Sequence, residues 1–342
     1  MIEADDDAVA DLLVASIDFL REHGGWLHPA ARLVEREGQL TIECDADEGD
    51  LLLRVPRSAL LPVHRINWSS DTTTLSIESL GEWPDAADLG LLLTQIGLHN
   101  ACAKIPFISA THPSAAPSLS ESVVAAMRAL VPSFRQRPMS AAEVFWATRT
   151  FSAPAFSGAP EPVAVPVLDL LDHHRRGATP VFDDGFTVSV AHPTGTSQCF
   201  LDYGLARDAI EMAVVYGFAD ASNPLARSAP LRFTHPETGE VLIADHGRVD
   251  TGELLPIAVE RDGEVWVVNR LPLVDTEVVD QLTHAGGPSR EWSQAMVECA
   301  RALNLELLDE LDAALSMDAV SPATDVLSAA VHHQRRLLSR DG

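Results

Sequence analysis

The chain has little positive charge. Its 342 residues include 24 Lys and Arg against 50 Asp and Glu, so the formal net charge is −26. Lys104 is the single lysine, and together with abundant alanine this suggests a GC-rich bacterial source. A negative field of this size repels nucleic acids and anionic membranes, and it favours cationic partners or simply solubility. We therefore expect no nucleic-acid partner and no membrane partner.

Paired cysteines and long apolar runs are also missing. The four cysteines lie far apart and form no Cys-x-x-Cys pair, which argues against a disulfide framework and a zinc ribbon. No apolar run is long enough to cross a membrane, and no signal peptide is recognisable, so the expected location is the cytoplasm. The Gly-x-Ser-x-Gly elbow, the phosphate-binding glycine loop and the Rossmann glycine pattern are absent as well.

Tyrosine is scarce, and its two occurrences lie close together. Tyr203 ends the stretch Gly195-Thr-Ser-Gln-Cys-Phe-Leu-Asp-Tyr-Gly204, and Tyr216 begins Tyr216-Gly-Phe218, which Asn223-Pro224 follows. Residues 198–202 have the composition of a short β-strand, and Gly204 permits a sharp change of direction after it. Shortly before this stretch comes Val165-Pro-Val-Leu-Asp-Leu-Leu-Asp-His-His174.

These stretches resemble the core of the SET-domain methyltransferases, in the branch typified by the Rubisco large-subunit lysine methyltransferase. In that branch the first stretch reads V-P-x-x-D-x-x-N-H. The second reads G-x-Q-x-F-x-x-Y-G and is followed by Y-G-F and N-P. Further upstream, Gly49, Leu51, Leu52, Val55 and Pro56 match another family motif. The resemblance covers nearly the whole chain, and its densest part is residues 165–224.

The resemblance implies an α+β fold. It would consist of a SET-domain β-fold, with small sheets and a pseudoknot, in residues 1–271. A helical insertion at about 85–155 would interrupt this domain, and a short helical C-terminal domain would occupy residues 272–342.

Local patterns predict individual elements. Apolar periodicity, alternation and capping residues indicate helices over residues 8–22 and 292–311, from Ser140 and from Ser321-Pro322, and strands over 39–44, 51–58 and 264–268, with a hairpin turn at 235–239. His332 and His333 are expected on the exposed face of the last helix.

The resemblance also implies site residues and a cofactor. Tyr203 would be the catalytic tyrosine, and Asp172, His173 and Gln39 would bind S-adenosylmethionine. The acceptor would be a lysine or histidine side chain or a small amine. In such enzymes positioning of cofactor and acceptor supplies most of the rate acceleration. The alternative for Tyr203 is a structural tyrosine packed into the core at the end of a strand.

Three departures from the family pattern lead to a second hypothesis. Asp172 replaces an asparagine, and an ionised carboxylate can only accept hydrogen bonds. Glu37 and Gln39 replace two glycines, and Ala153-Pro-Ala-Phe156 lacks the arginine of a Ser-Arg-x-Phe signature. The chain would then be a divergent SET scaffold without methyl transfer, serving as a binding or regulatory module or catalysing another reaction. A metal site at residues 172–174 is a further alternative, although adjacent side chains usually diverge and no third ligand is evident.

Overall fold

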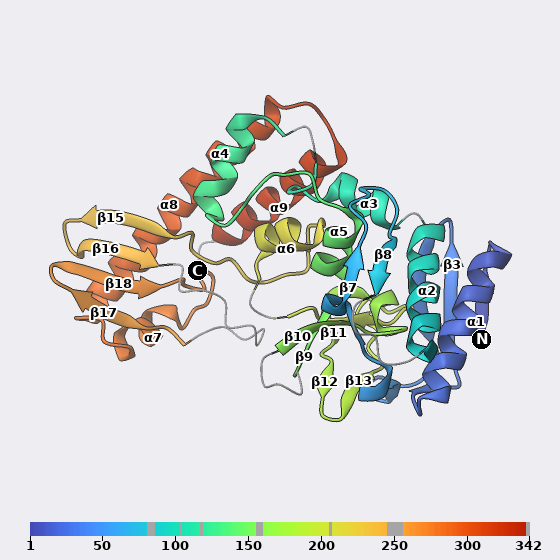
Figure 1. Cartoon of the computed structure of the whole chain (residues 1–342). Coiled ribbons are helices and arrows are strands. Elements are labelled where there is room, and N and C mark those ends of the chain that lie inside the picture. Colours follow the sequence, from blue (N-terminus) through green and yellow to red (C-terminus); the bar gives the residue numbers. More distant parts are fainter. Residues whose placement is uncertain are drawn as a thin grey trace. The chain divides into compact units, whose positions relative to one another are not determined.

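The computed structural model describes residues 1–80, 86–102, 104–116, 119–154, 160–204, 207–244 and 256–339. The chain forms two compact units, each built from two stretches of sequence (Figure 1). Unit 1 comprises Met1–Ser109 and Met139–Gly204, and unit 2 comprises Ala110–Pro138 and Leu205–Gly342. Neither boundary coincides with residue 271, so the predicted division into residues 1–271 and 272–342 stays a prediction.

Unit 1 begins with a short strand and an amphipathic helix. Helix α1 (Asp7–Glu22) starts at Asp6, whose carboxylate accepts a hydrogen bond from the Ala8 amide at 2.8 Å. Its apolar face is buried through Val9, Leu13 and Leu20, because these side chains recur at helical spacing. The helix predicted over residues 8–22 is confirmed.

The strands that the structure describes in unit 1 form five small sheets. The largest joins β12, β13, β5 and β2, a second joins β1, β3 and β4, and the others join β6, β10 and β9, β7 and β8, and β11 and β14. The strands are β1 (Ile2–Ala4), β2 (Trp26–Leu27), β3 (Ala31–Arg36), β4 (Gln39–Cys44), β5 (Leu51–Pro56), β6 (Leu61–Pro62), β7 (Ile66–Trp68), β8 (Ile77–Leu80), β9 (Phe151–Pro154), β10 (Pro160–Ala164), β11 (Asp172–Ala178), β12 (Val181–Phe182), β13 (Gly185–Ser189) and β14 (Phe200–Leu201). The predicted strands over 39–44 and 51–58 correspond to β4 and β5.

Helices fill the region of the predicted insertion. They are α2 (Ala86–Ala101), α3 (Lys104–Thr111), α4 (Glu121–Leu130) and α5 (Ala141–Arg149). Helix α5 opens with the predicted capping box, in which the Ser140 hydroxyl accepts from the Glu143 amide and the Glu143 carboxylate accepts from the Ser140 amide. The prediction of a helix starting at Ser140 is thus confirmed.

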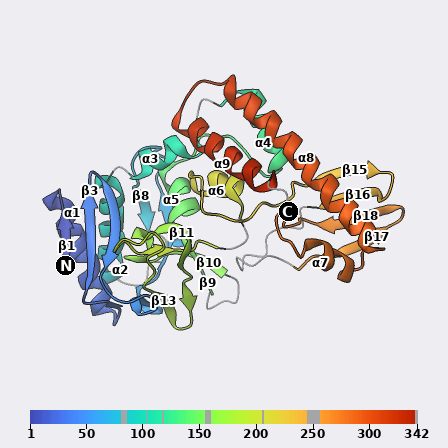
Figure 2. The same cartoon turned by 180° about the vertical axis from the view of Figure 1, so that it is seen from behind.

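In the described part of unit 2, helices pack against a mixed four-stranded sheet. The sheet order is β15 (Leu231–His235), β16 (Gly239–Ala244), β18 (Val265–Asn269) and β17 (Val259–Asp262), and the helices that follow it in the chain are α7 (Val278–His284), α8 (Arg290–Ser316) and α9 (Pro322–Leu338). Figure 2 shows α8 and α9 side by side. The predicted hairpin turn, the strand over 264–268 and both C-terminal helices are confirmed.

One expectation about the last helix is wrong. His332 is exposed, but His333 is buried, with its Nε2 2.6 Å from the carbonyl oxygen of Asn223. His333 faces α6 (Ala209–Tyr216) and the chain that follows it, because α9 packs on that segment.

The α+β class with several small sheets is confirmed. Among the residues that the structure describes, no helix combines the length and the apolar character needed to span a membrane. The cytoplasmic location and the bacterial source stay predictions.

Candidate functional site

Strands β11 and β14 bring the two sequence motifs of unit 1 together. They run parallel, with Asp172 opposite Phe200 and His173 opposite Leu201. A bulge follows, and Ala178 at the other end of β11 also lies opposite Leu201. Both ends of β11 therefore lie beside the short strand β14, and we call this close approach the crossing of β11 and β14.

Gly177 makes this close approach possible. A Cβ atom at this position would lie 2.5 Å from the carbonyl carbon of Leu201, closer than non-bonded carbon atoms tolerate. The approach is closed by a hydrogen bond of 3.0 Å from the Asp202 amide to the Ala178 carbonyl. A glycine in a strand often marks such a close contact between backbones.

Tyr203 lies beside His173 directly after the crossing. Its hydroxyl donates to the Leu171 carbonyl at 2.7 Å, and its amide donates to Nδ1 of His173 at 3.0 Å. The two rings have their centroids 5.0 Å apart. Because Nδ1 of His173 accepts a hydrogen bond, the proton of its neutral ring is on Nε2. Three of the four predicted site residues, Asp172, His173 and Tyr203, thus lie together.

Two carboxylates flank the crossing and differ in how they are paired. Asp202 is buried and binds the Arg175 guanidinium at 3.0 Å and the Gly204 amide at 3.1 Å. Asp172 is half-buried, and its Oδ2 accepts a 3.4 Å hydrogen bond from the side chain of Gln198. No described residue donates a hydrogen bond to Oδ1 of Asp172. This oxygen is available to an additional donor.

Sequence reasoning missed two contributors to this arrangement. The Leu171 carbonyl and the Gln198 amide contact Tyr203 and Asp172, respectively. Gln198 occupies a defined position of the second motif, so the motif could have indicated it. A main-chain carbonyl such as that of Leu171 leaves no signal in a sequence, since every residue has one.

Gln39 lies elsewhere, at the start of β4. It closes a two-residue hairpin turn in which Glu37 has φ +52° and Gly38 has φ +76°, the conformation that suits a tight hairpin. The Glu37 amide donates to Asp5 at 3.2 Å, and the Gly38 amide donates to Glu35 at 2.6 Å. Carboxylates of this chain therefore occupy the backbone donors of the turn.

The opposite end of β4 contacts the segment leading into β14. The Cys44 amide donates to the Ser197 carbonyl at 2.8 Å, and the Cys199 amide donates to the Ile42 carbonyl at 2.7 Å. Gln198, whose side chain binds Asp172, pairs with Glu43 near the C-terminal end of β4. Asp172 is thus connected to this end of β4, whereas Gln39 is the first residue of the strand.

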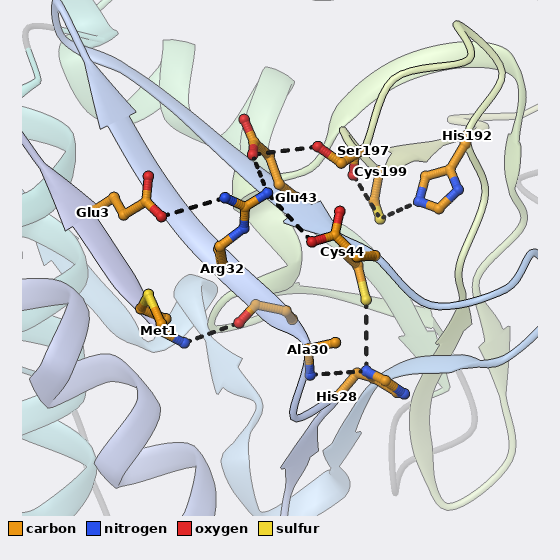
Figure 3. A network of polar contacts seen from close by, with 12 residues as sticks. Met1, Glu3, His28, Ala30, Arg32, Glu43, Cys44, His192, Ser197 and Cys199 are labelled. Carbon is orange, nitrogen blue, oxygen red and sulfur yellow. Dashed lines mark hydrogen bonds and ion pairs between the residues drawn. The ribbon is translucent and has the colours of Figure 1, made fainter.

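Figure 3 shows the polar network around this contact. Arg32 binds Glu43 at 3.0 Å and Glu3 at 3.4 Å, and the Ser197 hydroxyl donates to Glu43 at 3.3 Å. These bonds connect β1, β3 and β4 with the segment before β14. The network is a structural support for the site.

The thiols at this contact are poorly suited to nucleophilic chemistry. Burial, followed by the nearby Cys44 thiol, raises the pKa of Cys199 to about 12. Its sulfur lies 3.7 Å from Nε2 of His192, and that of Cys44 lies 3.6 Å from Nδ1 of His28. A thiol with a raised pKa is protonated at neutral pH, and the thiolate is the reactive form. Among the described residues, no group of three or more His, Cys, Asp or Glu side chains could hold a metal ion.

The segment before β11 is conformationally unusual. Val167 is fully buried and has φ +68°, which is rare for a β-branched residue. The short helix η3 (Leu168–Leu170) follows, and the Asp169 carboxylate within it binds Nε2 of His99 at 2.9 Å. Such outliers persist where surrounding contacts impose them, and they cluster at functional sites.

The family signature around residue 154 is only partly within the described structure. Ala153 and Pro154 end β9, whereas Ala155 and Phe156 lie outside the described residues. The effect of the missing arginine stays a prediction.

The second tyrosine belongs to unit 2. Tyr216 ends α6, and its hydroxyl accepts a 2.8 Å hydrogen bond from Arg207. The side-chain amide of Asn223 donates to the Arg207 carbonyl at 2.7 Å. The Tyr-Gly-Phe and Asn-Pro motifs thus meet at Arg207.

Comparison with known proteins gives weak likenesses. No protein-family model matches the chain, and no curated protein matches it. Among solved structures it is similar to the SET domain of LSMT bound to lysine and AdoHcy, with 12% identity and a TM-score of 0.43 over 97% of this chain and 90% of that chain. It is also similar to the same domain bound to methyllysine and AdoHcy (14%, 0.43, 98% and 90%) and to Rubisco LSMT bound to sinefungin and monomethyllysine (14%, 0.41, 98% and 90%). These values are too low to establish a family, so a function has to be argued from the residues of this chain.

Proposed function

We propose that this protein is an S-adenosylmethionine-dependent N-methyltransferase with a SET-type core in unit 1. The observation that carries the proposal is the meeting of two motifs that are about thirty residues apart in the sequence. Tyr203 of the second motif bonds to Leu171 and His173 of the first, at 2.7 and 3.0 Å. The resemblance to SET domains rests on these same two motifs.

The residues around the crossing have distinct proposed roles. S-adenosylmethionine, when bound, supplies an activated methyl group on a sulfonium. Asp172 would hold an amino or hydroxyl group of the cofactor through Oδ1, since a carboxylate accepts hydrogen bonds from both. The Tyr203 hydroxyl, oriented by its bond to the Leu171 carbonyl, would position the acceptor nitrogen. The net charge of −26 favours an acceptor that carries positive charge before it loses its proton, such as a lysine side chain or a small amine.

The hairpin turn at residues 37–38 does not fit a cofactor contact through its amides. Both amides already donate to carboxylates, and Gly38 lies against the Cys102 carbonyl, which a Cβ would approach to 3.3 Å. Cofactor binding would thus depend on residues 171–173 and 198–203. The contact predicted for Gln39 stays a prediction.

The first test is calorimetric titration of the purified chain with S-adenosylmethionine and S-adenosylhomocysteine. Micromolar binding of both is expected. Asp172→Ala should weaken it, whereas Asp183→Ala, an exposed aspartate in the turn between β12 and β13, should not. Absence of binding at millimolar ligand would contradict the methyltransferase proposal.

The second candidate is a SET-type scaffold without methyl transfer. The occupied amides of the hairpin turn and the aspartate at position 172 favour it. On this hypothesis neither S-adenosylmethionine nor S-adenosylhomocysteine binds, and Asp172→Ala changes only the free energy of unfolding. The same titration therefore separates the two candidates.

A further inference from the structure

A groove of about 540 Å³ lies between the β7–β8 hairpin and α5 in unit 1. Figure 1 shows these elements beside one another. Trp68, at the end of β7, and Trp146, in the last two turns of α5, line it together with serine and asparagine side chains. None of residues 171–173 or 198–203 lines the groove, so its chemistry is independent of the proposed methyl transfer.

The two tryptophans form a rigid aromatic corner. Their ring planes meet at 80°, with centroids 6.5 Å apart. The indole of Trp68 is held by a 3.1 Å hydrogen bond to the Val63 carbonyl, and its ring also packs against buried Phe145. Trp146 keeps 37% of its surface exposed, although large apolar side chains are normally covered. A tryptophan face attracts cations more strongly than other aromatic faces.

Two carboxylates give the groove a negative charge. Glu143 is fixed by the capping box, in which it accepts from the Ser140 amide at 2.9 Å. Glu78 is exposed, and no described residue donates a hydrogen bond to it or pairs with it. No lysine or arginine is found among the described residues that line the groove.

A bulge in the hairpin places Glu78 beside the aromatic corner. Asn67 lies opposite Ser79, but Trp68 lies opposite Ile77, so Glu78 is the extra residue of β8. Bulges re-aim side chains and are common next to functional sites. The rim is also ordered, because the Asp71 carboxylate accepts from the Thr73 and Thr74 amides and its carbonyl accepts from the Ala141 amide at 2.7 Å.

We propose that this groove binds a small organic cation with a quaternary methylated ammonium group, held by the faces of Trp68 and Trp146 and by the Glu78 carboxylate. A quaternary methylated ammonium ion has no N–H hydrogen-bond donor to lose, so aromatic faces and a nearby carboxylate can replace its hydration. The acidity of the whole chain adds to the attraction.

The test uses choline as the ligand and its neutral analogue 3,3-dimethylbutan-1-ol, in which carbon replaces the ammonium nitrogen. Binding to the full chain is followed by tryptophan fluorescence and by the indole N–H signals in NMR spectra. Choline should bind at least about tenfold more tightly than the alcohol, the size expected of a cation–π contribution. Equal affinity for the two compounds, or no binding of choline, overturns the proposal.

Two variants and a matched control locate the site. Trp146→Ala should weaken choline binding about tenfold, and Glu78→Gln should weaken it and reduce its dependence on salt. Trp26→Ala is the control, since Trp26 is also 37% exposed but lies on β2 outside the groove. If Trp146→Ala does not fold, Glu78→Gln decides. Unchanged binding by the folded variants overturns the proposal.

Discussion

At the scale of single residues, Tyr203 has a structural and a proposed catalytic role at once. Its hydroxyl donates a hydrogen bond to the main-chain carbonyl of Leu171, which lies within the first motif. The two roles predict different consequences of losing the hydroxyl, and these can be measured separately.

Tyr203→Phe should lower methyl transfer by about 100-fold if the hydroxyl positions the acceptor. It should also lower the free energy of unfolding by about 1–3 kcal/mol, because the Leu171 carbonyl loses its donor. Turnover is measured by release of S-adenosylhomocysteine and stability by urea unfolding. Tyr216→Phe is the control, as the other tyrosine belongs to unit 2. A loss of stability with full turnover would leave Tyr203 a purely structural residue.

His112 makes the stability of unit 2 depend on pH. Burial lowers the pKa of His112 from 6.5, although hydrogen bonding to the Val215 carbonyl acts in the opposite direction. Its Nδ1 accepts from the Ser114 amide at 3.3 Å, which requires an unprotonated nitrogen. The unfolded chain therefore binds a proton more readily than the folded one.

His112 should consequently make its full contribution to stability above about pH 6.5. The free energy of unfolding should fall as the pH drops below this value through the lowered pKa of the folded state. Urea unfolding at a series of pH values measures the slope. His112→Gln should flatten the slope, and His332→Gln, which alters an exposed histidine, should leave it unchanged. The same slope in all three proteins would contradict the assignment.

At the scale of elements, the crossing of β11 and β14 depends on a position without a side chain. Gly177 could not be distinguished from other glycines by sequence, because its neighbour Leu201 is 24 residues away. Gly90, in contrast, is exposed in the second turn of α2, and a Cβ there would meet nothing within 4 Å.

Gly177→Ala should destabilise unit 1 by more than about 3 kcal/mol, since the methyl group would overlap a strand backbone. Gly90→Ala should instead stabilise the protein by up to about 1 kcal/mol, because alanine favours a helix. Thermal unfolding of both variants checks the pair. Equal effects would mean that β14 does not approach Gly177 as described.

A buried pair of side chains, His99 and Asp169, connects helix η3 to α2. The side chains of His99 and Asp169 are almost fully inaccessible and lie 2.9 Å apart. Nδ1 of His99 and Oδ1 of Asp169 have no partner among the described residues. The pair is therefore sensitive to the loss of either member.

His99→Leu should cost about 3–5 kcal/mol of stability, because it leaves the Asp169 carboxylate buried and unpaired. The double variant with Asp169→Leu should recover part of this loss. His64→Leu is the matched control: it removes the exposed pair with Glu161, which is worth at most about 1 kcal/mol. Chemical denaturation of the wild type, His99→Leu, Asp169→Leu, the double variant and the control tests the coupling, and simple additivity of the two single losses would refute it.

At the scale of the whole molecule, the net charge of −26 acts on both stability and partners. Repulsion among like charges opposes the compact state and is screened by salt. The melting temperature should therefore rise between about 10 and 300 mM sodium chloride, over which the screening length shortens from about 30 Å to less than 10 Å. Calorimetric scans test this. A melting temperature that falls with salt would show that ion pairs such as Arg32–Glu43 outweigh the repulsion.

Many elements could be predicted from local patterns. The periodicity of α1, the capping box of α5 and the Ser321-Pro322 start of α9 are decided by neighbours within about one turn, so a linear sequence contains them. The resemblance carried by residues 165–204 also predicted that Asp172, His173 and Tyr203 belong to one site, and the structure brings these three residues together.

Other features depend on residues far apart in the sequence, and only the tertiary structure decided them. His333 was expected to be exposed but is buried against Asn223. The amides of the hairpin turn at 37–38 donate hydrogen bonds to the carboxylates of Asp5 and Glu35. The aromatic corner joins Trp68 to Trp146, 78 residues later. Local propensity selects helix or strand, whereas the partner of each polar or aromatic group is selected by packing between distant segments, where it must satisfy every buried donor and acceptor at once.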